Sequence, residues 1–159
     1  MSSGLYDLAL FLHLFGAFSL VSGTVVAGVG FEIARRRRSC AEIALALSVS
    51  RIGALLLVAG ATLAAGFGLW LVALGHWGWG APWVDLAIAA LIVIAAVGGY
   101  AGQPAKRARR LAVHLSGEGR EPTPQLIALL NDRIALALNY AAAVILVGIV
   151  VDMVFKPGA

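Results

Sequence analysis

Four long apolar stretches divide the chain, and short polar or basic segments separate them. They cover residues 5–33, 52–74, 83–101 and 126–155. The hydrocarbon core of a bilayer is ~30 Å thick, and a helix of about 20 apolar residues crosses it. Backbone groups inside the bilayer must be hydrogen-bonded locally, so each stretch is expected to be helical. The pattern predicts an all-α bundle of four transmembrane helices that forms a single domain over residues 1–159.

Basic residues at the ends of these stretches predict the orientation of the bundle. Of the 12 Lys and Arg residues, all but Lys156 fall on one side of the predicted membrane. These are Arg35, Arg36, Arg37, Arg38, Arg51, Lys106, Arg107, Arg109, Arg110, Arg120 and Arg133. Positively charged loops stay in the cytoplasm. We therefore expect both termini and the loop 75–82 to lie outside.

The amino-acid composition is typical of a membrane protein and argues against several other classes of protein. The chain is 61% hydrophobic and 13% charged, whereas soluble domains are about half apolar and about a quarter charged. The net charge of +4 does not indicate nucleic-acid binding, because the basic residues lie where membrane topology requires them. Cys40 is the single cysteine, which excludes an internal disulfide and a thiolate cluster.

Capping signals predict where the helices begin. Ser39 followed by Glu42 is a capping-box pattern, so the second helix is expected to begin before its apolar part. Pro82 is expected to open the third helix, and Thr123-Pro124 a fourth helix that runs to residue 155. The polar stretch 100–124 is expected to be flexible, with a short basic surface helix over residues 106–115.

Small residues predict how the first two helices pack. They recur at steps of three or four in both stretches, where they let helices approach closely in lipid. The first set is Gly16, Ser19, Gly23, Ala27 and Gly30, and the second is Gly53, Gly60, Ala64 and Gly68. The simplest interpretation is that the first helix packs against the second. The alternative is that some of these glycines leave room for a flat ligand.

His13 is the histidine that falls inside a predicted span. It lies eight residues after Leu5, or ~12 Å along a helix at 1.5 Å per residue, which places it in the outer half of the bilayer. An imidazole at this depth is a candidate ligand for haem iron or another metal, or a proton relay. Gly16, one turn later, would leave room for the edge of a macrocycle. The alternative is a neutral histidine that bonds a neighbouring helix, with a hydroxyl such as that of Ser19 or with Asn139.

Other polar residues gather at the same outer end. Asp7 opens the first helix, Asp85 the third, Asp152 closes the last, and His76 lies in the tryptophan-rich loop 75–83. With His13, these five side chains are candidate ligands for zinc or copper, although none of them shows a metal-binding spacing. The dipoles of helix N-termini account for Asp7 and Asp85, whereas Asp152 lies where the dipole opposes it. The tryptophans are expected to anchor the loop at the membrane boundary, and the alternative is an aromatic rim around a site that includes His76.

The segment Leu10-Phe11-Leu12-His13-Leu14-Phe15-Gly16-Ala17 resembles the first helix of small bacterial integral-membrane families with a Leu-His-Leu-x-Gly-Ala pattern. With Arg51 opening the second span, the chain is similar to a family of predicted four-helix integral membrane proteins of unknown function. It is more distantly similar to the copper-resistance D family and to the membrane-bound protoporphyrinogen oxidase of the J type.

The resemblance to the oxidase implies haem b held by a first-helix histidine, at the position of His13, and a lysine in the third helix. Span 83–101 contains no lysine, and Lys106 lies beyond its inner end. The resemblance to the copper family implies metal handling at the outer side. Both resemblances imply a multi-pass protein of the bacterial cytoplasmic membrane.

Two functional classes follow from these observations. In the first, the chain binds haem b, copper or zinc through His13, with His76 as the candidate second ligand. In the second, it is a non-catalytic accessory or scaffold subunit, or a small carrier, and its polar residues serve packing. The expected partners are the lipid bilayer and either a second copy of the chain or another membrane protein. No nucleophile with a base, phosphate loop or carboxylate pair indicates a particular enzyme.

Overall fold

The computed structural model describes residues 3–75 and 81–156, and in these ranges the chain is helical and contains no strand. The helices are α1 (Ser3–Arg36), α2 (Cys40–Gly75), α3 (Pro82–Gly117), α4 (Pro124–Leu130) and α5 (Arg133–Phe155). Four segments are long and apolar enough to cross a membrane, with α4 and α5 together as the fourth. The predicted all-α architecture with four membrane-spanning segments is therefore confirmed.

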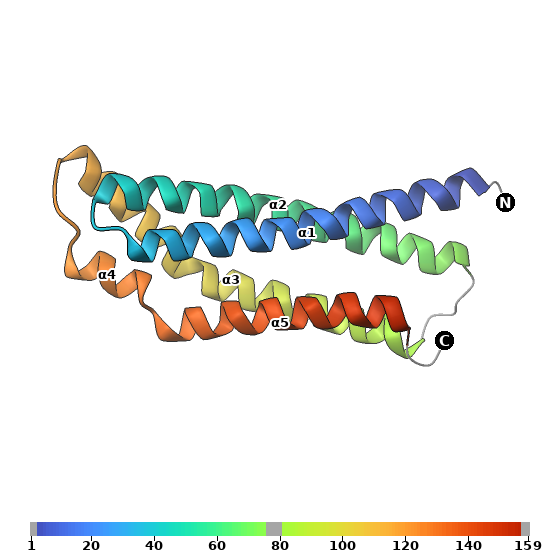
Figure 1. Ribbon diagram of the computed structural model, residues 1–159. Coiled ribbons are helices and arrows are strands. Elements are labelled where there is room, and N and C mark those ends of the chain that lie inside the picture. The colour runs from blue at the N-terminus through green and yellow to red at the C-terminus, as the bar shows by residue number, and fades with distance from the viewer. Residues whose placement is uncertain (1–2, 76–80, 157–159) are drawn as a thin grey trace.

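The helices form two antiparallel pairs (Figure 1). α1 lies along α2, and α3 lies along α5. The start of α1 and the end of α5 lie at the same end of the bundle, while α4 and the turn from α1 to α2 lie at the opposite end. We call the end with α4 the inner end and the other the outer end, after the predicted orientation.

The largest buried cluster lies at the inner end. It brings together the turn between α1 and α2, the last turns of α3, and α4. Its members are Ala34, Cys40, Ile43, Ala46, Leu47, Ala108, Ala112, Leu115, Leu126 and Leu130. Smaller clusters lie around Leu20, Ile94 and Leu146, and around Val72, Trp83 and Val84 at the outer end. Many other large apolar side chains are exposed, as expected where lipid replaces water.

The predicted packing of the first helix against the second is confirmed. A Cβ added to Gly16, Gly23 or Gly30 would overlap backbone atoms of α2, and one added to Gly53 or Gly60 would overlap backbone atoms of α1. The Ser50 hydroxyl also donates a hydrogen bond to the carbonyl oxygen of Ala27 at 2.8 Å. The small residues therefore let the two backbones touch along most of their length.

The inner half of α3 differs from the prediction. Residues 100–117 are not a flexible stretch with a separate surface helix but the continuation of one helix of 36 residues that includes Pro104. Ala108, Ala112 and Leu115 follow at steps of four and three and are buried in the inner cluster. This packing stabilises the helix beyond a proline that removes one backbone hydrogen bond.

The fourth predicted helix is broken in two, which the prediction missed. Thr123 caps α4 as expected, since its hydroxyl accepts a hydrogen bond from the amide of Leu126 at 3.4 Å. The helix then stops, and the Asp132 carboxylate caps α5 by accepting hydrogen bonds from the amides of Ile134 and Ala135, both at 3.0 Å. An aspartate at this position favours a new helix start over a continuous helix. At α2, Ser39 likewise accepts from the amide of Glu42 at 3.3 Å, as predicted.

Candidate functional site

His13 is held by the backbone of α2. Its Nδ1 lies 2.8 Å from the carbonyl oxygen of Ala64. Because a carbonyl oxygen only accepts, Nδ1 carries the proton in this hydrogen bond, and Nε2 then presents its lone pair. The ring is half-buried. The structure thus contains the hydrogen bond to a neighbouring helix that was the alternative for His13, but its partner is neither a hydroxyl nor Asn139, which is exposed.

Two glycines shape the surroundings of His13 in different ways. A Cβ on Gly68 of α2 would lie 3.0 Å from Nδ1 and 3.1 Å from Cε1 of the imidazole, so the absence of a side chain there makes room for the ring. A Cβ on Gly16 would instead lie 2.5 Å from the backbone nitrogen of Ala64. The space beside Gly16 that we expected to admit a macrocycle is thus filled by α2, and Gly16 serves helix packing.

The candidate metal ligands remain dispersed as far as the structure describes them. Residues 3–75 and 81–156 contain no group of three or more His, Cys, Asp or Glu side chains that could hold a metal ion. Asp7 and Asp85 are exposed, and Asp85 lies in the first turn of α3, where a helix N-terminus favours its charge. His76 lies outside the described residues.

Asp152 is the buried member of this set. Its side chain is 7% exposed, and neither carboxylate oxygen has a hydrogen-bond partner among the described residues. An unsatisfied buried polar group costs about 1–3 kcal/mol, and more when it is charged. Beside it along the chain, Lys156 ends α5 in a left-handed conformation, and its ammonium group lies 5.5 Å from the centre of the Trp83 ring.

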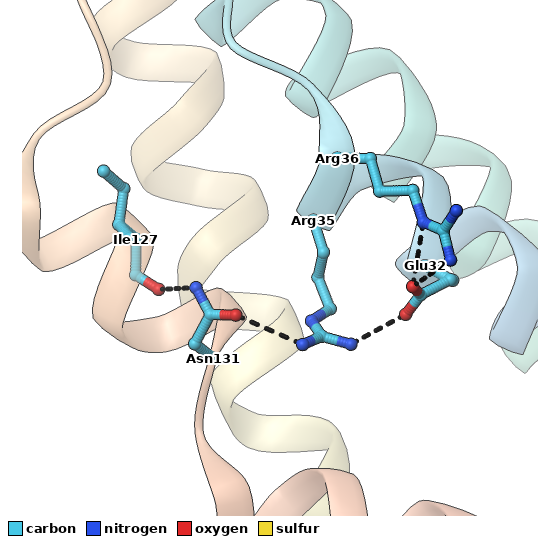
Figure 2. A network of polar contacts seen from close by, with 5 residues as sticks. All are labelled: Glu32, Arg35, Arg36, Ile127 and Asn131. Atoms are coloured by element: carbon cyan, nitrogen blue, oxygen red, sulfur yellow. Dashed lines mark hydrogen bonds and ion pairs between the residues drawn. The ribbon is translucent and has the colours of Figure 1, made fainter.

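At the inner end, a polar network connects α1 to α4 (Figure 2). Arg35 donates to Glu32 at 2.7 Å and to the side-chain oxygen of Asn131 at 3.2 Å. Asn131 in turn donates to the carbonyl oxygen of Ile127 at 2.9 Å. Arg36 also pairs with Glu32, at 2.9 Å. Arg35 therefore supplies a side-chain hydrogen bond between the end of α1 and the C-cap residue of α4, in addition to the apolar packing of Leu126 and Leu130.

From the sequence alone, the run from Arg35 to Arg38 could bind anionic lipid, but topology is sufficient to account for it. The run of four arginines gives no sign of which guanidinium turns toward the protein, because this depends on where α4 lies. Asn131 likewise lay within what was predicted to be a continuous helix. The break before Asp132, signalled by the polar pair Asn131-Asp132 inside an apolar stretch, was the feature that would have revealed both.

Comparison with known proteins bears out the first of the resemblances. The family described as "Predicted integral membrane protein (DUF2269)" matches residues 7–157. No curated protein and no solved structure matches the chain. The more distant similarities to the copper-resistance and oxidase families stay predictions. With four membrane-spanning segments and a match over nearly its whole length, the chain belongs to the DUF2269 family of predicted integral membrane proteins and is a multi-pass membrane protein.

Proposed function

We propose that this protein binds haem in the outer half of the membrane and that His13 would hold it through Nε2. The observation that carries the proposal is the hydrogen bond from Nδ1 to the carbonyl oxygen of Ala64. Histidines that ligate metals commonly donate their other ring N–H to a carbonyl or carboxylate, which fixes the tautomer and the orientation of the ring. His13 has this arrangement.

The number of ligands favours haem over zinc or copper. Structural zinc sites use four protein ligands and catalytic ones three, whereas haem iron needs one or two axial ligands from the protein. The described residues bring no three candidate ligands together. A single oriented imidazole therefore suits haem better, and His76 is the candidate second ligand.

The neighbouring helix limits the direction from which a ligand could reach His13, because Gly68 and Ala64 of α2 lie against the imidazole. Since α2 fills the space beside Gly16, the ligand would approach the Nε2 edge of the ring. Haem would supply redox chemistry there, while the protein holds and orients the imidazole.

The three histidines of the chain provide a matched test. The protein would be expressed with adequate haem and metal supply, purified in mild detergent, and examined for its visible spectrum and metal content. We expect a Soret band that His13→Ala removes and His114→Ala preserves, because His114 is an exposed residue of the inner end. His76→Ala should shift the visible bands if His76 is the second ligand. His13→Gln, which retains an N–H donor, guards against loss of folding.

Two outcomes would overturn the proposal. One is a Soret band that remains unchanged in both His13 variants. The other is a colourless wild-type protein: if it contained zinc or copper, the metal alternative would replace haem, and if it were also metal-free, the non-catalytic accessory subunit or carrier would be the better interpretation.

A further inference from the structure

A positively charged pocket lies at the inner end, between the turn from α1 to α2 and α4. Its volume is about 240 Å³, and Arg35, Arg37, Arg38 and Asn131 supply its polar lining. No carboxylate lines it. Apolar atoms of Ile43 complete the wall on the α2 side. The pocket therefore combines three guanidinium groups with one amide.

These arginines are only partly neutralised by neighbouring acids. Glu32 is engaged by Arg35 and Arg36 on α1, while Arg37 reaches Glu42 only at 3.9 Å. Within the described residues Arg38 makes no hydrogen bond or ion pair, so its guanidinium is the donor left over in the pocket lining. Nε of Arg35 also has no hydrogen-bond partner, but it is buried. Guanidinium groups arranged in this way favour a phosphate, which accepts several charge-assisted hydrogen bonds at once.

A mostly apolar groove shares one lining residue, Arg37, with the pocket. It has a volume of about 520 Å³ and lies between α1 and α2. Val26, Gly30 and Ile33 line it along one face of α1, and Arg37 of the following turn continues this line. Glu42 of α2, which lies 3.9 Å from Arg37, is the carboxylate in the lining. A molecule with an anionic head and a hydrocarbon tail would match the two cavities together, because the groove points along the membrane-crossing helices.

We propose that the pocket and the groove form a binding site for one anionic phospholipid. Its phosphate lies among Arg35, Arg37 and Arg38, and one acyl chain lies in the groove between α1 and α2. Anionic headgroups attract basic clusters beside a membrane-crossing helix. Here the arginine cluster lines a pocket and shares Arg37 with the apolar groove. Charges that only set the membrane topology would need neither cavity. The proposal is independent of haem binding at His13.

Charge-matched variants separate this site from general attraction to a charged surface. The Arg37→Gln/Arg38→Gln pair removes two guanidinium groups of the pocket. The Arg107→Gln/Arg110→Gln pair removes the same charge from exposed positions of α3 that do not line the pocket. Val29→Trp fills the groove without a change of charge, since Val29 lines it. Arg35 is left intact because it also bonds Asn131 at the end of α4.

The experiment titrates the full chain in detergent with phosphatidylglycerol, phosphatidylcholine and inorganic phosphate, and counts bound molecules by native mass spectrometry. We expect one phosphatidylglycerol per chain, bound more tightly than phosphatidylcholine. The pocket pair should weaken binding about tenfold or more, because it removes charge-assisted contacts. Val29→Trp should weaken it about as much, because the indole occupies the space of the acyl chain, and the α3 pair should weaken it little. Circular dichroism confirms that each variant is folded.

Three results would overturn the lipid site. The first is equal binding of the two lipids. The second is equal weakening by the pocket pair and the α3 pair, which would indicate only diffuse charge. The third is inorganic phosphate that competes fully with lipid while Val29→Trp has no effect, which would assign the pocket to a soluble phosphate ligand.

Discussion

Asp152 is a buried carboxylate that has no hydrogen-bond partner among the described residues. The side chain lies at the C-terminal end of α5, where the helix dipole opposes a negative charge. A residue that costs stability in this way is typical of functional sites, where local rules are broken for a purpose.

We predict that Asp152→Leu stabilises the folded protein by about 1–3 kcal/mol, because it removes an unsatisfied polar group from an apolar site. Unfolding in mixed micelles with increasing dodecyl sulfate, followed by circular dichroism, measures the difference. Asp85→Leu is the control, since Asp85 is exposed in the first turn of α3, and its loss should lower stability by about 0.3–1 kcal/mol. A lower stability for Asp152→Leu would mean that its carboxylate has a stabilising partner.

At the scale of single residues, the sequence predicted the kind of environment around a side chain better than it predicted the hydrogen-bond partner of that side chain. His13 was predicted to lie within a membrane span, and a hydrogen bond to a neighbouring helix was the alternative to a role as a haem or metal ligand or a proton relay. The partner in the structure is the carbonyl oxygen of Ala64. Which carbonyl lies opposite the imidazole depends on the register between α1 and α2, and a backbone atom leaves no signal in the sequence. Asp152 was recognised as unexplained by the helix dipole, but its burial follows from the packing of the outer end.

The contact between α1 and α2 is the closest pairing of elements in the bundle, and it rests on glycine. A Cβ on Gly60 would overlap the backbone nitrogen of Leu20, whereas a Cβ on Gly66, six residues further along α2, would meet nothing within 4 Å. The two positions therefore differ in packing while they share a helix and a residue type.

We predict that Gly60→Ala destabilises the protein by about 1–3 kcal/mol, because the helices must separate to admit the methyl group. Gly66→Ala should be neutral or should stabilise by up to about 1 kcal/mol, since alanine is the better helix former. The same dodecyl sulfate titration compares the two variants. Equal effects at both positions would show that helix propensity, and not close packing, sets the cost.

At the scale of elements, the sequence predicted that four spans exist and that they alternate in direction, but it did not predict where every helix begins and ends. The apolar stretches and their caps predicted four spans, because length and hydropathy are local properties. The inner half of α3 was predicted as part of a flexible polar stretch with a separate surface helix over residues 106–115. Tertiary packing of Ala108, Ala112 and Leu115 overrides the polar pattern of this stretch. The break between α4 and α5 was missed because Leu126, Leu130 and Ala135 on both sides of it are apolar and buried.

For the whole molecule, the structure places the start of α1 and the end of α5 at the same end of the bundle (Figure 1). It also gathers the arginines of α1 and the basic residues of α3 at the opposite end. The direction of this bundle in the membrane is a prediction from charge: eleven basic residues at one end hold that end in the cytoplasm.

We predict that a cysteine at Gly78 reacts with a membrane-impermeant maleimide added to intact cells, whereas a cysteine at Glu118 reacts only after the membrane is permeabilised. Gly78 lies outside the described residues, and its position follows from the predicted outer loop. Glu118 is exposed at the C-terminal end of α3, so its substitution should leave the bundle intact. Both variants are made with Cys40→Ala, which removes the native thiol. Cys40 is buried, so the wild-type chain, tested in parallel, should label weakly under either condition.

The opposite result, in which Glu118→Cys is labelled in intact cells and Gly78→Cys is protected, would mean that the bundle is inverted and that His13 lies in the inner half of the membrane. The proposed lipid site would then face the outer leaflet, because the arginines and the groove move with the helices that carry them.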